Sequence, residues 1–348
     1  MVRRLGLALA CAAMFACGSS DSTGDGVPDK KRGFVPPPAD SAPSAAPTTT
    51  GDPGATTGEP KGPFPLVFLH GMGGFEKLHL GPGNLQYWEG LREELAKDGE
   101  FQVFVTEAPP YDTSEVRAAT IAKQIDDVLK QTGAPKVNLI GHSQGGLDAR
   151  VIASPGGLGY GKKIGGVVTI ATPHRGSRVA DSLLGSIGGL PIDDVANGFL
   201  GLLQKTVYDV QSDANLRAQA TELTESYMAK TFNTKFVDAP GVYYGSYGGR
   251  TNRASGVGAC DGSVYPNEPS KLDDVQPVLF ATAVYLENKK GVPNDGLVTV
   301  ESAKWGEFLQ CVPADHLKEI GMNDPAGGAF DHRALFRSVV KHLRSKGL

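Results

Sequence analysis

Ser143 stands in the sequence Gly-His-Ser-Gln-Gly, between a short apolar run and a segment typical of a helix start. A serine flanked by these glycines is typical of a nucleophile on a sharp strand-to-helix turn. A side chain at Gly141 or Gly145 would collide with nearby backbone, and the helix would direct the positive end of its dipole toward an oxyanion. The pattern predicts nucleophilic attack on a carbonyl carbon. The alternative is a serine that only caps a helix.

A serine nucleophile needs a base that accepts its proton and a carboxylate that orients the base. We expect Asp295, in an Asn-Asp-Gly turn, to be the carboxylate and His316 to be the base. Three other histidines compete for the role of base. His174 follows a strand end, where we expect it to structure its loop. His332 and His342 fall in a terminal helical pattern, where solvated histidines are expected.

The elements that would position these residues alternate between apolar runs and helical patterns. This alternation predicts an α/β fold with a mostly parallel, right-handed sheet and helices on both faces. A capping box of Asp112 and Glu115 is expected to begin one helix, and Gly133 to end it. The expected strands are 65–69, 101–105, 137–140 and 165–171; the expected helices are 87–97, 112–133, 273–286 and 330–344; residues 245–265 are expected to be a loop.

Residues 182–210 differ in kind from the rest, because apolar residues there are interrupted by glycines and by Asp193-Asp194. This pattern predicts short amphipathic helices joined by hinges, which we assign to a lid at about residues 178–212. Such a lid can close over a site in water and open at a lipid interface. The alternative is a fixed helical cap.

The first 62 residues do not have the composition of a globular domain. Residues 1–17 resemble a signal peptide, and Cys17 follows a lipobox-like Met-Phe-Ala, which predicts lipidation of an exported protein; ordinary signal cleavage is the alternative. Residues 18–62 are rich in Pro, Ser, Thr and Gly and are expected to be a flexible tether. Residues 63–348 then form one catalytic domain.

Charge and cysteine content restrict the partners further. The net charge of −4 gives no indication of a nucleic-acid partner. No later apolar run is long enough to span a bilayer, so contact with a membrane is expected only through the lipid anchor. Cys260 and Cys311 are an even pair in an exported chain, which favours a disulfide.

Several motifs occur together, in consistent order, between about Pro63 and Gly321: LVFLHGMGGF, YWEGL, VFVTEAPPYDTSEVRAATI, KVNLIGHSQGGLDARVI, ATPHRGS, PNDGLV and ADHLKEIG. Together they resemble bacterial lipase family I, the lipases of Pseudomonas and Burkholderia type. The resemblance implies an α/β-hydrolase fold with a lid and the hydrolysis of triacylglycerols or other carboxylic esters. It implies a triad of Ser143, Asp295 and His316, with the backbone N–H groups of Met72 and Gln144 as the oxyanion hole.

The resemblance also implies a disulfide between Cys260 and Cys311, and for many family members a foldase partner. A short-chain carboxylesterase, or a phospholipase or acyltransferase, could use the same triad. A surface binding module without catalysis is the remaining alternative from another functional class.

One departure from the family concerns its structural calcium site, next to the catalytic histidine. Asp273 matches one family ligand, but Lys318 occupies the position of a second carboxylate, and Met322 lies where a glutamine is usual. A lysine offers calcium no oxygen ligand. We expect no metal cofactor, with the ammonium group of Lys318 replacing the ion beside Asp273. A shifted site built from Glu319 or Asp274 is the alternative.

Overall fold

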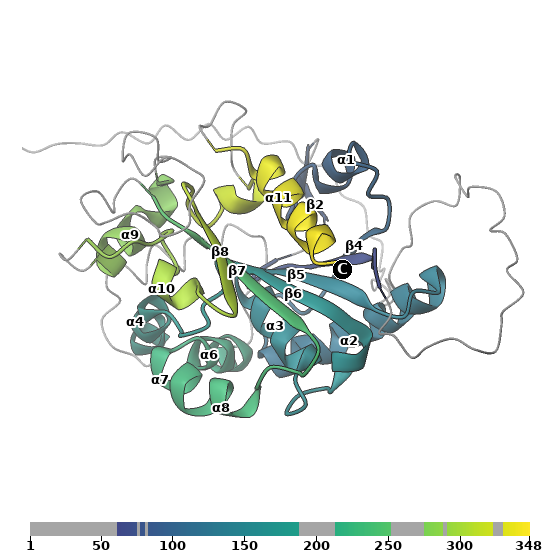
Figure 1. The fold of residues 1–348 in the computed structure, drawn as a ribbon. Helices are drawn as coiled ribbons and strands as arrows, with labels where there is room; N and C mark the ends of the chain where they lie inside the picture. Colours follow the sequence, from purple (N-terminus) through teal and green to yellow (C-terminus); the bar gives the residue numbers. More distant parts are fainter. Residues whose placement is uncertain are drawn as a thin grey trace, which may run out of the picture. The chain divides into compact units, whose positions relative to one another are not determined.

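The structure is a computed structural model that describes residues 61–74, 77–80, 83–187, 213–251, 275–287, 291–322 and 330–348. Its centre is a six-stranded sheet in which every neighbouring pair is parallel, with the strand order β4-β1-β5-β6-β7-β8 (Figure 1). These strands are β1 (Leu66–Leu69), β4 (Val103–Thr106), β5 (Val137–His142), β6 (Ile164–Ile170), β7 (Tyr243–Gly249) and β8 (Glu307–Val312). A separate antiparallel hairpin consists of β2 (Lys77–Leu80) and β3 (Gly83–Gln86).

Helices cover both faces of the sheet, with α1 and α11 on one side and α2 and α3 on the other (Figure 1). Strands β4, β1, β5 and β6 are mostly apolar and are buried along their whole length, as expected for strands that are covered on both faces. The α-helices are α1 (Leu91–Ala96), α2 (Ser114–Thr132), α3 (Gln144–Ala153), α4 (Arg178–Ile187), α6 (Asp213–Glu222), α7 (Glu225–Tyr227), α8 (Asn233–Lys235), α9 (Phe280–Glu287), α10 (Val300–Ala303) and α11 (His332–Ser345).

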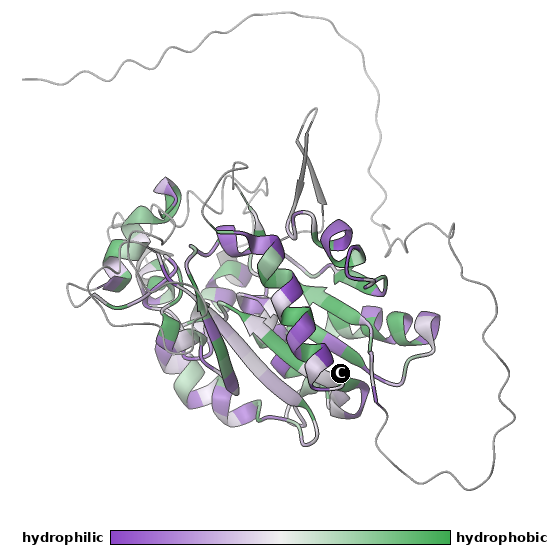
Figure 2. Cartoon of the chain, turned by 45° about the horizontal axis from the view of Figure 1, so that its top comes forward, coloured by the Kyte–Doolittle hydropathy of each residue, from purple (hydrophilic) through white to green (hydrophobic). Residues whose placement is uncertain are grey.

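Two sequence predictions of local structure are wrong. Residues 245–249 were expected in a loop but belong to β7, a strand of Tyr, Gly and Ser that is pale on the hydropathy scale of Figure 2. The expected capping box before α2 does not form: Thr113 is the N-cap residue without a side-chain bond, and Asp112 Oδ1 accepts from the Thr113 N–H (2.8 Å). The predicted end of α2 is confirmed, because Gly133 is its left-handed C-cap, with φ of 67°.

The two ends of the domain meet. The Gly62 N–H donates to the Gly347 carbonyl oxygen (2.9 Å), just before β1 begins at Leu66. The candidate site lies at the C-terminal ends of the strands, because Ser143 directly follows β5 and Thr172 lies just beyond β6. In a parallel sheet, the two ends of the catalytic domain and the candidate site therefore lie at opposite ends of the strands.

Candidate active site

The turn that carries Ser143 joins β5 to α3 as predicted. Ser143 has φ of 55° and ψ of −130°, an unusual conformation for a residue with a side chain, which costs on the order of 1–3 kcal/mol. Two hydrogen bonds hold it there: the Ser143 N–H donates to the Ile170 oxygen (2.9 Å), and the Thr172 hydroxyl donates to the Ser143 oxygen (2.8 Å). The strain is therefore balanced by contacts with the neighbouring strand and its loop.

The two glycines around Ser143 are required by close packing of backbone. A Cβ atom at Gly141 would lie 2.5 Å from the Gly145 carbonyl carbon, and one at Gly145 would lie 2.3 Å from the Leu69 oxygen. Both distances are shorter than any ordinary contact of a Cβ atom. The steric reason given for the Gly-x-Ser-x-Gly pattern is thus present in the structure.

The structure brings the side chains of Asp295 and His316 into contact. His316 Nδ1 lies 2.8 Å from Asp295 Oδ2, and both side chains are buried. Asp295 Oδ1 accepts hydrogen bonds from the backbone N–H groups of Leu297 (2.8 Å) and Val298 (2.7 Å). The backbone N–H of His316 donates to the backbone oxygen of Asp295 (2.9 Å). With Nδ1–H directed at the carboxylate, Nε2 of His316 is left to accept a proton.

Ser143 and His316 line one pocket together with Met72. The pocket has about 870 Å³ of empty space, a figure that includes the open side facing solvent. Its walls beyond the polar groups are mostly apolar. These walls include Val179, Ala180 and Leu183 of α4, Ala220 and Leu223 at the end of α6, and Leu297, Val298, Leu317, Ile320 and Met322.

The backbone beside Met72 is oriented by the preceding residues. His70 Nε2 accepts from the Ala108 N–H (3.1 Å), so Nδ1 carries the proton and donates to the Gly71 oxygen (2.9 Å). Burial, followed by the charge of Arg117, lowers the pKa of His70 to about 3, so this imidazole is neutral. In a trans peptide, C=O and N–H point in opposite directions. Fixing the Gly71 carbonyl therefore directs the Met72 N–H away from His70.

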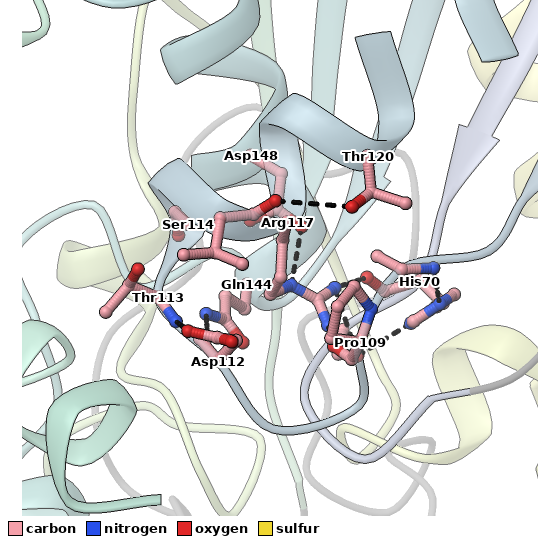
Figure 3. A network of polar contacts seen from close by, with 12 residues as sticks. His70, Pro109, Asp112, Thr113, Ser114, Arg117, Thr120, Gln144 and Asp148 are labelled. Carbon is pink, nitrogen blue, oxygen red and sulfur yellow. Dashed lines mark hydrogen bonds and ion pairs between the residues drawn. The ribbon is translucent and has the colours of Figure 1, made fainter. Parts of the chain in front are cut away.

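Arg117 of α2 supports the same loop, and its side chain points toward His70 and Pro109 (Figure 3). Its guanidinium donates to the carbonyl oxygens of His70 (2.6 Å) and Pro109 (2.6 Å), and more distantly to that of Gly71 (3.4 Å). Its Nε lies 2.9 Å from Asp148 Oδ2 of α3, and neither side chain is exposed. Burial raises the pKa of Asp148 to about 6, although Arg117 acts against this. The ion pair thus connects the Met72 loop to the helix that follows Ser143.

Sequence reasoning missed Arg117, although a signal was present. Arg117 precedes Ile121 and Ile125 by four and eight residues, so it occupies the apolar face of the predicted helix. A cation on such a face must be paired when buried.

Among the described residues, the backbone N–H groups of Met72 and Gln144 have no hydrogen-bond acceptor, which leaves them available to a ligand.

Comparison with known proteins places the chain in a family. Residues 65–297 match the alpha/beta hydrolase fold family. The chain belongs to this family. It is 29% identical over 322 residues to a triacylglycerol lipase of Pseudarthrobacter phenanthrenivorans, across 82% of this chain and 98% of that protein. It is 30% identical over 297 residues to a triacylglycerol lipase of Vibrio cholerae, across 82% of this chain and 89% of that protein.

The solved structures agree on the fold. The crystal structure of a Bacillus licheniformis lipase in its mature form superposes with a TM-score of 0.56 at 21% identity, across 81% of this chain and 94% of that one. The Staphylococcus hyicus lipase gives 0.55 at 18% identity, across 83% and 97%. The predicted α/β-hydrolase fold and the resemblance to bacterial triacylglycerol lipases are therefore confirmed.

The three histidines of this alpha/beta hydrolase that competed for the role of base have structural partners. His174 is buried, stacks on Trp305 and contacts Thr169 (3.0 Å), in keeping with the expected loop-structuring role. His332 is 8% exposed, so the expectation of a solvated side chain is wrong: its Nε2 contacts the Glu89 oxygen (3.0 Å). His342 Nε2 lies 2.8 Å from the Tyr243 hydroxyl.

A second buried cluster adjoins His316, whose ring lies 4.5 Å from that of His142. The Tyr87 hydroxyl accepts from the Gly71 N–H (2.8 Å) and lies 2.6 Å from His142 Nδ1, and His142 Nε2 lies 3.4 Å from Glu319. Burial raises the pKa of Glu319 well above its usual range, with Asp295 adding to the shift. His142, His316 and Glu319 have potential ligand atoms within 4.8 Å of one another.

The calcium position implied by the family resemblance offers few free oxygen ligands among the described residues. The Asp315 carboxylate accepts backbone N–H groups of Gln276 (2.8 Å), Leu317 (3.0 Å) and Lys318 (2.9 Å), and the Met322 oxygen accepts from the Gln276 side chain (3.0 Å). Burial raises the pKa of Asp315, while these hydrogen bonds and the Lys318 charge act against it. These described residues do not fit calcium. Asp273 and Asp274 lie outside the described residues, so the pairing of Lys318 with Asp273 stays a prediction.

Other sequence predictions also fall outside the described part of the hydrolase. They concern the signal peptide, Cys17, nearly all of the tether, and lid residues 188–212, although α4 covers the first part of the predicted lid. Cys311 is buried in β8, but Cys260 is not described, so their disulfide stays a prediction. None of the described helices has both the length and the apolar character needed to cross a bilayer.

Proposed function

We propose that this chain is a triacylglycerol lipase, which hydrolyses carboxylic esters of lipids through an acyl-enzyme on Ser143. The observation that carries the proposal is one mostly apolar pocket lined by both Ser143 and His316, with His316 bonded to buried Asp295. Apolar walls suit an acyl chain, and the related proteins named above are triacylglycerol lipases.

The proposal assigns one role in the reaction to each of these groups. Ser143 Oγ attacks the ester carbonyl carbon while His316 Nε2 takes its proton, and Asp295 holds the imidazole tautomer. The N–H groups of Met72 and Gln144 donate to the tetrahedral oxyanion. His316 then protonates the leaving alcohol, which departs and leaves the acyl-enzyme. Water then attacks the acyl-enzyme ester while His316 takes its proton. The resulting tetrahedral intermediate collapses, His316 returns the proton to Ser143, and the fatty acid is released.

Covalent labelling and hydrolysis would test this proposal together. A fluorophosphonate reacts only with an activated serine, so the wild-type chain should be labelled and Ser143→Ala should not be. The same substitution should lower ester hydrolysis by on the order of 10⁶-fold without unfolding the domain. Absence of labelling in the folded wild-type chain would refute the catalytic assignment.

Hydrolysis of p-nitrophenyl esters from acetyl to palmitoyl would define the substrate class. A preference for long chains supports a lipase, whereas a preference for short chains would indicate a carboxylesterase. Phospholipid hydrolysis or acyl transfer to an added alcohol would show the remaining uses of the same triad.

We also propose that the chain is exported and anchored by lipid at Cys17, and that a foldase assists its maturation. Support comes from the lipobox-like sequence and the composition of the tether. Metabolic labelling with a radioactive fatty acid should mark the wild-type chain and not Cys17→Ser. Equal yields of active enzyme from cells with and without a lipase foldase would contradict the second part.

A further inference from the structure

The side chain of Gln144 links the nucleophile turn to helix α6. Its Oε1 accepts from Gln219 Nε2 of α6 (2.6 Å), and its Nε2 donates to the Asp112 oxygen (2.9 Å). Gln219 Nε2 also reaches the Pro110 oxygen (3.3 Å), and both glutamine side chains are buried. Gln144 directly follows Ser143, and its side chain makes this separate contact.

Helix α6 forms part of the pocket wall next to this contact. Ala220 follows Gln219 directly in α6, and Leu223 comes directly after the last residue of α6, with its N–H bonded to the Gln219 oxygen (3.1 Å). Both line the pocket, although Gln219 itself does not. Any movement of Gln219 relative to Gln144 would therefore move this wall relative to Ser143.

Two further contacts hold the end of α6. Glu222 accepts the Ser114 N–H at the start of α2 (2.7 Å). Leu223 continues the connection, because its carbonyl oxygen accepts the Ser177 N–H (2.8 Å) just before α4. Glu222 and Leu223 thus hold the end of α6, and the hydrogen bond of Gln219 links the preceding turn of α6 to Gln144.

We propose that Gln219 is a positioning residue for acyl-chain selectivity: through its hydrogen bond to Gln144 it fixes α6, and with it the Ala220 and Leu223 wall that contacts the acyl chain. The inference rests on the proposed ester hydrolysis. Gln219 touches neither the reacting atoms nor the substrate. Its effect, through the wall, is therefore limited to substrates whose acyl chains are long enough to reach Ala220 and Leu223.

The substitution Gln219→Leu tests this role, because leucine can neither donate to Gln144 nor replace the amide contact with Pro110. We expect the ratio of kcat/KM for p-nitrophenyl palmitate to that for the butyrate to fall about tenfold, equivalent to 1.4 kcal/mol. The loss should appear as a higher KM for palmitate, while kcat for butyrate and labelling by a fluorophosphonate stay within about twofold of wild type. Asn215→Leu, which replaces an exposed amide on the same helix, should leave the ratio unchanged.

Other outcomes separate this inference from the proposed function. An unchanged ratio in a folded Gln219→Leu variant, or an equal loss for all esters, would overturn the role of Gln219. Absence of labelling and hydrolysis in the wild type would refute the proposed function instead. If Gln219→Leu does not fold, Gln219→Met keeps the unbranched shape without the amide, and the same ratio decides.

Discussion

The Arg117 guanidinium and the Asp148 carboxylate form an ion pair of 2.9 Å in which neither side chain is exposed. One cation thereby serves two functions that mutation can separate. It neutralises a buried acid of α3, and it holds the carbonyl oxygens of His70 and Gly71 just before Met72. Stability depends on the first function, and we expect catalysis to depend on the second.

Replacing Arg117 by methionine should therefore affect both properties. The variant leaves Asp148 buried without its cation, which should lower the free energy of unfolding by about 3–5 kcal/mol. Loss of the donors to the His70 and Gly71 carbonyls should also lower kcat by about 10²-fold, because the Met72 N–H is no longer held in one direction. Urea unfolding and ester hydrolysis measure the two effects.

The double variant Arg117→Met with Asp148→Leu distinguishes the two functions. Apolar replacement of both partners should restore most of the lost stability, since no unpaired charge stays buried. It should not restore kcat. Recovery of kcat together with stability would show that Arg117 acts only through folding.

Glu222 should make stability depend on pH. Burial raises the pKa of Glu222 to about 7, from 4.5 for an ordinary glutamate, and the neighbouring Asp148 adds to the shift. Between these values the folded chain binds more protons than the unfolded chain, so the free energy of unfolding falls as pH rises from about 4.5 to 7. At about 1.4 kcal/mol per unit, the loss is on the order of 3 kcal/mol.

The substitution Glu222→Gln should remove this part of the pH dependence while keeping an acceptor for the Ser114 N–H. Tm should then decrease less between pH 5 and pH 8 than in the wild type, with a remaining slope from Asp148. Glu225→Gln, at an exposed position three residues later, is the matched control and should behave as wild type. Parallel curves for wild type and Glu222→Gln would contradict the assignment.

Removal of metal should leave the enzyme unchanged. If Lys318 replaces calcium as expected, EDTA should alter neither Tm nor activity, and added calcium should not reverse any effect. Lys318→Ala should lower Tm, because Asp315 and the expected partner Asp273 then lose a neighbouring cation. A drop in Tm with EDTA that calcium restores would show that a shifted calcium site exists.

Two neighbouring glycines of β7 should respond differently to alanine. A Cβ atom at Gly249 would lie 1.8 Å from Glu319 Oε1 and 2.8 Å from the Asp295 Cβ, whereas one at Gly248 would lie 3.3 Å from Ala303. Gly249→Ala should therefore cost about 1–3 kcal/mol of stability and lower kcat by displacing Asp295. Gly248→Ala should be close to wild type in both. Equal effects in thermal unfolding and hydrolysis would contradict this reading.

These glycines also explain why β7 escaped prediction. Its sequence Tyr-Tyr-Gly-Ser-Tyr-Gly-Gly lacks the β-branched residues that indicate a buried strand, and glycine normally weakens strands. Gly249 is needed because Asp295 and Glu319 pack directly against the backbone. A strand whose composition is set by packing from distant segments cannot be identified from its own residues.

The start of α2 shows the same limit. The sequence predicted a local cap from Asp112 and Glu115, but the Ser114 N–H is bonded instead to Glu222, 108 residues away. By contrast, the turn at Ser143 was predictable because its strand, glycines and helix are contiguous. Arg117, Gln219 and Glu222 were not identified as supporting residues because their partners come together only in the folded chain.

The contact between Gly62 and Gly347 places both ends of the catalytic domain where the strands begin, while the pocket opens where they end. A domain coupled to a solid support through either terminus would therefore present its pocket to the solution and not to the support. Immobilisation through a terminal tag should preserve access for bulky substrates, whereas coupling through a cysteine introduced near Met72 should block it.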